Sequence, residues 1–161
     1  MPNPQPEHEA IARQVVAENH YLTLATADAD GTPWATPVFF AARDVTTFVW
    51  VSAPGTRHSR NLAVRPVVAI TIFDSHVPIG GAEAVYVRAH AEAVPDDEVE
   101  ASVALLNERL PERQHLTADD FEPAGPLRAY RAEAVELSIL VRGGSAGSDS
   151  PTDTRAIVPF A

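Results

Sequence analysis

The sequence predicts a mainly β protein with short helices, built as one small closed barrel of about six or seven antiparallel strands. Segments in which apolar and polar residues alternate recur along the chain, whereas a helical period occurs in only a few short stretches. Turn-forming Gly, Pro and Asp residues separate these segments. The 161 residues, 45% of them apolar, are enough for one sizeable core. We therefore expect a single domain over residues 1–161, whose closed sheet leaves no exposed edge.

The N-terminal region predicts a helix followed by a hairpin. We expect residues 1–6 to form a loose arm and residues 7–18 to form an amphipathic helix, with Ile11 and Val15 on one face. The period then changes to two in "YLTLATA", residues 21–27, and the turn sequence "DADG" follows it. This change of period marks the start of the sheet.

The next two strands are predicted at residues 34–42 and 47–52, which complete a meander with the first strand. Pro37 cannot donate a ladder hydrogen bond, so its position should be a bulge or a sheet edge. The aromatic side chains of this region are expected in the core: Trp34, Phe39, Phe40, Phe48 and Trp50.

The second half of the chain predicts three long elements and a short last strand. Strands are expected at residues 67–73 and 84–94, and a final long strand at residues 128–140. Between them, residues 96–110 have an acidic first turn and a helical apolar stripe. The stripe consists of Val99, Val103, Leu106 and Leu110. We expect a flexible loop at residues 143–154, after which "RAIVPF" returns as a short strand.

Composition excludes several classes of function. The net charge of −10 argues against nucleic acid as a partner, because a phosphate backbone requires a broad basic face. There is no cysteine, which removes disulfides and thiolate chemistry, and the six histidines lack metal-ligand spacing, so no metal site is predicted. No apolar run reaches membrane length and the first residues do not resemble a secretion signal. We therefore expect a cytoplasmic protein that does not bind membranes.

The stretch "SAPGTRHSRNL", residues 52–62, has the parts of a phosphate site. No acidic residue occurs between Asp44 and Asp74 in this otherwise acidic chain. Thr56 stands at the predicted N-cap of a short helix, whose first N–H groups are free to bind an anion. Arg57 and Arg60 lie three apart, so both guanidinium groups can project from one helical face. The competing interpretation is a solvated basic surface helix, and the residues by themselves leave both open.

No catalytic side chain emerges from the remaining motifs. His58 and Ser59 are adjacent, but they lack the Gly-x-Ser-x-Gly context of a hydrolytic nucleophile. Asp119 and Asp120 in "LTADDFEP" are predicted to cap a turn rather than to form an acid pair.

The order of these segments resembles the pyridoxamine 5′-phosphate oxidase-like family of flavin-binding proteins. The resemblance covers about residues 21–94 and depends on three elements: Gly-Thr-Pro at residue 31, Ser-x-x-Gly-Thr-Arg at residue 52, and Asn-Leu…Arg-Pro-x-Val from residue 61. It implies a six-stranded antiparallel split β-barrel that forms a homodimer and holds FMN at the subunit interface.

The resemblance also implies which residues contact the cofactor. Arg57 matches the phosphate-binding arginine of the family, and His58 stands where the family has a lysine. His58 is expected to contribute a hydrogen bond, which strengthens if the ring is protonated at mildly acidic pH. Further matches lie on the two strands before the helix, and the helix N-terminus itself adds Thr56 and Arg60. The candidate cofactor-binding residues are therefore Thr36, Pro37, Val38, Val51, Ser52, Thr56, Arg57, His58 and Arg60.

Three functional readings follow. The first is an FMN-binding oxidoreductase that acts on a small molecule. The second is a reductase that uses the deazaflavin coenzyme F-420, whose acidic tail would need further basic residues, with Arg60, Arg65 and Arg88 as candidates. The third is a non-catalytic dimer that binds flavin or haem. Pyridoxamine phosphate oxidation itself is disfavoured, because Thr36 and Ala84 replace an arginine and a glutamine of the family oxidase and only Arg155 could stand in for its C-terminal segment.

Overall fold

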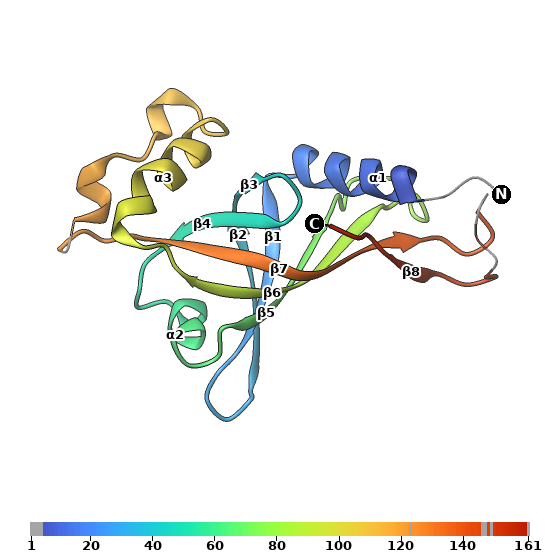
Figure 1. The fold of residues 1–161 in the computed structure, drawn as a ribbon, viewed down its shortest axis with the longest axis horizontal. Coiled ribbons are helices and arrows are strands. Elements are labelled where there is room, and N and C mark those ends of the chain that lie inside the picture. The colour runs from blue at the N-terminus through green and yellow to red at the C-terminus, as the bar shows by residue number, and fades with distance from the viewer. Residues whose placement is uncertain (1–4, 123, 146–147, 149, 161) are drawn as a thin grey trace.

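The computed structural model describes residues 5–122, 124–145, 148 and 150–160. It contains three α-helices, three short 3-10 helices and eight strands within these residues (Figure 1). The helices are α1 (Gln5–Glu18), α2 (Arg57–Val64), α3 (Val99–Asn107), η1 (Asp96–Glu98), η2 (Glu112–Gln114) and η3 (Ala118–Phe121). The strands are β1 (Tyr21–Ala27), β2 (Pro33–Phe39), β3 (Ala41–Arg43), β4 (Thr47–Ser52), β5 (Val67–Phe73), β6 (Ala84–Ala93), β7 (Arg128–Val141) and β8 (Thr154–Ile157).

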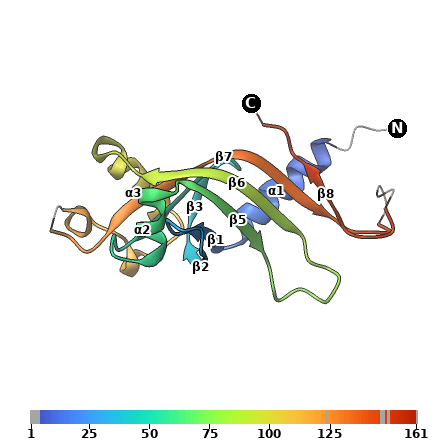
Figure 2. The ribbon, with the colours of Figure 1, turned by 90° about the horizontal axis from the view of Figure 1, so that it is seen from below.

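The strands form one antiparallel sheet that curls into a split barrel. Its order is β2-β1-β5-β6-β7-β4-β3, with β8 added to β7. The two ends of this order, β2 and β3, are separated in the chain only by Phe40, so the sheet curves round until its ends meet in one bent segment. Figure 2 shows β5, β6 and β7 side by side along this curve. The predicted split β-barrel is therefore confirmed.

The described residues form eight strands, against the six or seven expected from the sequence and the six that the resemblance implies. The predicted strand at residues 34–42 is divided at Phe40, where the chain leaves its pairing with β1 and begins to pair with β4. The predicted C-terminal return strand is present as β8, which begins at Thr154, the last residue of the predicted loop, and ends at Ile157. Pro37 lies in the terminal strand β2, as its missing N–H requires.

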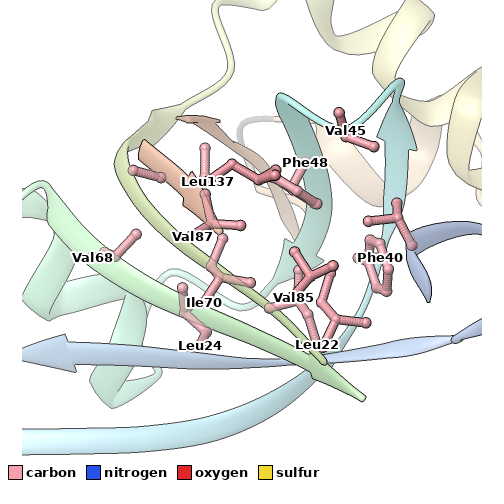
Figure 3. Packing of buried hydrophobic residues seen from close by; sticks show 14 of the residues in the cluster. Leu22, Leu24, Phe40, Val45, Phe48, Val68, Ile70, Val85, Val87 and Leu137 are labelled. Carbon is pink, nitrogen blue, oxygen red and sulfur yellow. The ribbon is translucent and has the colours of Figure 1, made fainter. Parts of the chain in front are cut away.

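Alternation along the strands builds the core (Figure 3). β1 and β6 turn every second side chain inward, and their partners on β5 do the same. The largest fully buried side chains are Trp50, Phe40, Phe48, Leu22, Leu24, Ile70, Ile72, Leu106, Leu137, Ile139, Val85 and Val158. The predicted alternation is thus confirmed for the strands that the sequence marked most clearly.

Two of the aromatic residues expected in the core lie outside it. Trp34 is 40% exposed and Phe39 is half-buried, whereas Phe40, Phe48 and Trp50 are fully buried. Trp34 lies near the turn of the β1–β2 hairpin, which projects beyond the rest of the sheet (Figure 1). Alternation puts Trp34 on the same face as Val38, but at this end the face is covered by α2 rather than by core side chains.

The helices occupy different sides of the barrel. α1 lies against β5, β6 and β7 through Ala12, Val15 and Val16. It begins at Gln5, two residues earlier than predicted, because Pro6 in the first turn lacks only an N–H that the helix does not use. α3 lies at the opposite end of the sheet from β8 (Figure 1).

α3 is shorter than the predicted helix. Residues 96–98 form a 3-10 turn, and Leu110 lies beyond the C-terminus of α3. Leu106 is the fully buried member of the predicted stripe and packs with Ala41 and Val49.

In η3, Asp120 accepts hydrogen bonds from the N–H and hydroxyl of Thr117, at 2.8 and 3.0 Å, which confirms its predicted capping role.

Arg109 joins α3 to the rest of the fold. Its guanidinium donates to the carbonyl oxygens of Phe40, Ala17 and Asn19 at 2.9, 3.2 and 2.6 Å, and lies 5.0 Å from the Phe40 ring centre. Burial lowers the pKa of this guanidinium, which remains charged at any physiological pH. Arg109 therefore fixes the strand break at Phe40 relative to the end of α1.

Among the described residues, no helix is long and apolar enough to cross a bilayer.

Candidate functional site

The predicted phosphate-binding stretch lies where β4 ends and α2 begins. β4 ends at Ser52, a turn closed by Thr56 N–H donating to Ala53 O at 3.1 Å follows, and α2 starts at Arg57. Thr56 occupies the N-cap with extended backbone angles, as predicted. However, its hydroxyl donates to Ala53 O rather than capping α2. The first-turn N–H groups of α2 therefore remain available to an anion.

Hydroxyl groups surround the His58 ring. His58 Nε2 lies 2.8 Å from Ser52 Oγ and 3.2 Å from Thr56 Oγ1, and Thr56 Oγ1 is 2.8 Å from Ser59 Oγ. His58 is 8% exposed, and this burial lowers its pKa below the ordinary value. The expected strengthening by protonation at mildly acidic pH is therefore opposed by burial, which favours the neutral ring.

Arg57 points toward the β1–β2 hairpin. Its Nη2 lies 3.3 Å from Asp28 Oδ2, and the guanidinium carbon lies 4.7 Å from the centre of the Trp34 ring. The Arg57 side chain is 39% exposed, so its remaining donors can reach a ligand. Arg60 instead donates to Gly55 O, so the two arginines diverge and the expectation of a shared face is wrong.

One face of α2 docks on the hairpin through polar contacts. Arg57, Asn61 and Arg65 recur every four residues on this face. Asn61, 3% exposed, donates to Thr26 Oγ1 at 2.9 Å, and Arg65 donates to Ala29 O at 2.8 Å. Sequence reasoning missed this role of Asn61 and Arg65, although their spacing from Arg57 was the available signal.

The other candidate residues lie on the adjoining strands. Val38 is buried in the core, Thr36 is half-buried and Pro37 is exposed on β2. Val51 points away from Ser52 and packs against the cluster formed by Ala41, Val49 and Leu106. The structure thus brings Ser52, Thr56 and His58 together, with Arg57 beside them, and links this cluster to β2 through Trp34.

A hollow of about 440 Å³ adjoins the other side of α2, in the size range of small-molecule sites. Arg60, Ser59 and Leu62 line it from α2, and Tyr130 and His90 line it from β7 and β6. Within the part of the chain that the structure describes, no group of three or more His, Asp or Glu residues could hold a metal ion.

Comparison with known families identifies the chain. The family model described as pyridoxamine 5′-phosphate oxidase matches residues 8–139. The chain belongs to this family. The match extends past the region of the resemblance to include α3 and most of β7. Comparison with curated proteins found no significant sequence match.

Solved structures with this fold bind different groups. HutZ, the haem storage protein from Vibrio cholerae, is 23% identical with a TM-score of 0.66, over 84% of this chain and 94% of that one. An FAD-binding protein from Mesorhizobium loti is 22% identical with a TM-score of 0.59, over 78% and 88%. An F420 reductase is 24% identical with a TM-score of 0.57, over 86% and 98%. At these identities the similarity establishes the split-barrel fold, and the choice of cofactor depends on the residues present in this chain.

Proposed function

We propose that this member of the family is an FMN-binding oxidoreductase that acts on a small molecule as a homodimer. The observation that carries the proposal is Arg57, a half-exposed guanidinium at an N-terminus of α2 that the Thr56 hydroxyl leaves uncapped. A guanidinium, free amide N–H groups and hydroxyls are the donors that a phosphate monoester requires.

The residues present fit the FMN phosphate. Ser52, Thr56 and Ser59 supply hydroxyl groups within one hydrogen-bonded cluster, and His58 holds that cluster in place. When bound, the flavin supplies hydride chemistry, and the chain supplies binding, orientation and electrostatics. No side chain of this cluster needs to act as an acid or base.

The charges around the site favour FMN over coenzyme F-420. Each of the three arginines that could hold an acidic tail has a partner within the chain, as Arg57 has in Asp28: Arg60 with Gly55 O, Arg65 with Ala29 O, and Arg88 with Glu136 at 3.5 Å. Asp28 and Asp30 lie in the neighbouring hairpin turn and would repel further carboxylates. A ligand with a single phosphate meets less repulsion here.

The outer face of the sheet supports the homodimer. Phe40 and Trp50 are buried within one chain, so they offer no apolar surface to a partner. A different apolar surface lies on β1, β2 and β5, where the outward side chains are small or apolar. Tyr21 is 62% exposed, Val67 60% and Phe73 46%. Exposed apolar faces of this kind mark protein interfaces, and a second copy of the chain would cover this one.

The test combines an absorption spectrum with ligand titration. Oxidised-flavin maxima in the purified protein support the proposal, whereas a deazaflavin or haem spectrum would favour the other readings. Arg57→Ala should weaken FMN binding about ten- to a hundred-fold, because a charged hydrogen bond is worth roughly 1.5–3 kcal/mol and each decade about 1.4 kcal/mol. Riboflavin, which lacks the phosphate, should bind both proteins alike.

Arg13→Ala provides the matched control. Arg13 also forms a single exposed ion pair, with Glu9 on α1, so its removal changes the net charge equally without touching the site. Equal FMN affinity in wild type and Arg57→Ala would refute the site assignment.

A further inference from the structure

The β1–β2 turn places a carboxylate against Arg57. Asp28 Oδ1 accepts the Thr32 N–H at 2.9 Å, while its backbone N–H donates to Thr32 O and its carbonyl accepts from Gly31 N–H. Its second oxygen, Oδ2, is left facing Arg57 Nη2. Asp28 is therefore held by its own turn, and Arg57 is the partner that can move.

The Arg57–Asp28 pair is loose. Its 3.3 Å separation exceeds the ~2.7–2.9 Å typical of a strong charge-assisted bond, and both side chains are about one-third exposed, at 39% and 33%. Such pairs contribute little to stability. The Trp34 ring supports the guanidinium from its face, which leaves the in-plane N–H donors free for exchange.

A second carboxylate increases the negative charge of this turn. Asp30 accepts hydrogen bonds from the N–H of Thr32 at 3.0 Å and from its hydroxyl at 2.8 Å. Hydrogen bonds from the N–H and hydroxyl of Thr32 favour the ionised form of Asp30 and hold its pKa below the ordinary value, so this group is ionised at any working pH. An anion that approaches Arg57 must therefore replace Asp28 and tolerate the charge of both carboxylates.

We infer that Asp28 is a specificity-determining residue of the cofactor site, which competes with phosphate for Arg57. The inference rests on the proposed function. Because the guanidinium is occupied, a free phosphate ion gains little by binding. FMN gains additional contacts through its ring and can displace the pair. Asp28 thus lowers the affinity of the site for every phosphate-bearing ligand, and only a ligand with further contacts, such as FMN, keeps enough affinity to occupy it.

The experiment measures FMN and riboflavin affinity in wild type, Asp28→Asn and Asp44→Asn. Asparagine at residue 28 keeps an oxygen acceptor for Thr32 N–H but removes the charge. Asp44 is the matched control, since it accepts the Thr46 N–H at 2.7 Å in the β3–β4 turn, away from Arg57. We expect Asp28→Asn to bind FMN about three- to ten-fold more tightly, with riboflavin unchanged. Inorganic phosphate should compete with FMN at a lower concentration in Asp28→Asn than in wild type.

The outcomes separate the two proposals. If wild type binds FMN no better than riboflavin, the phosphate site is wrong and the inference fails with it. If wild type prefers FMN but Asp28→Asn binds it equally or more weakly, only the inference is overturned. If Asp44→Asn gained the same FMN affinity, the cause would be the change in net charge, and the inference about Asp28 would also be overturned. Should Asp28→Asn misfold, Asp28→Ser, which retains a short acceptor for the turn, must show the same direction of change.

Discussion

At the scale of single residues, His58 shows how burial decides the chemistry of a side chain. The ring lies among hydroxyl groups, and burial lowers its pKa, so the folded protein favours the neutral form. The unfolded chain takes up a proton near pH 6.5, whereas the folded chain does so only at lower pH. The stability that His58 contributes is therefore present above pH 6.5 and is lost as the pH falls.

We predict that His58→Gln reduces the pH dependence of the unfolding free energy between about pH 7 and 5. Urea denaturation at several pH values measures this change. Ser59→Ala removes a hydroxyl of the same cluster but no titratable group, so its pH dependence should match that of wild type. Parallel pH profiles in His58→Gln and wild type would contradict the assignment.

At the scale of elements, α3 is attached to the barrel through one fully buried side chain. Leu106 is 0% exposed between Ala41 of β3 and Val49 of β4. Leu106→Ala should cost about 2–5 kcal/mol of unfolding free energy, because it removes buried methyl groups and leaves a cavity. Chemical denaturation gives the value directly.

Leu110→Ala is the matched control for this prediction. Leu110 belongs to the same predicted stripe, but it is half-buried and lies beyond the end of α3. Leu110→Ala should lower the unfolding free energy clearly less than Leu106→Ala does. Equal losses of unfolding free energy would contradict the prediction that Leu106 is a packed core residue and Leu110 a peripheral one.

At the scale of the whole molecule, the outer face of β1, β2 and β5 is the surface through which we propose that the chain dimerises. Ala69 lies near the centre of this face, paired with Ala25 on β1 and Arg88 on β6. Ala69→Glu should dissociate the proposed dimer, because the interface would have to remove water from the new carboxylate, whereas in the separate chain this carboxylate stays hydrated. Sedimentation should then report the 17.3 kDa monomer.

Ala104→Glu is the control for assembly, since Ala104 is exposed on α3, on another part of the molecule. This variant should sediment as wild type does. A wild-type protein that is already monomeric at micromolar concentration would remove the dimer from the proposal.

The amino-acid sequence by itself determined the strands, most of the core and the position of the stretch that we propose to bind phosphate. β1, β5 and β6 follow from period two, and α2 follows from a turn and an N-cap. These features depend on neighbours within a few residues, so a single chain displays them. The same holds for the capping role of Asp120.

Only the tertiary structure decided what these elements contact. Arg57 meets Asp28 across 29 positions of sequence, and Trp34 leaves the core because its hairpin extends past the barrel. The break at Phe40, which lets one segment join both ends of the sheet, depends on pairing with two different strands. A local sequence pattern predicts a strand or a helix but not what that element will contact. The contacts form only when the whole sheet curls and brings segments that are distant in the sequence together.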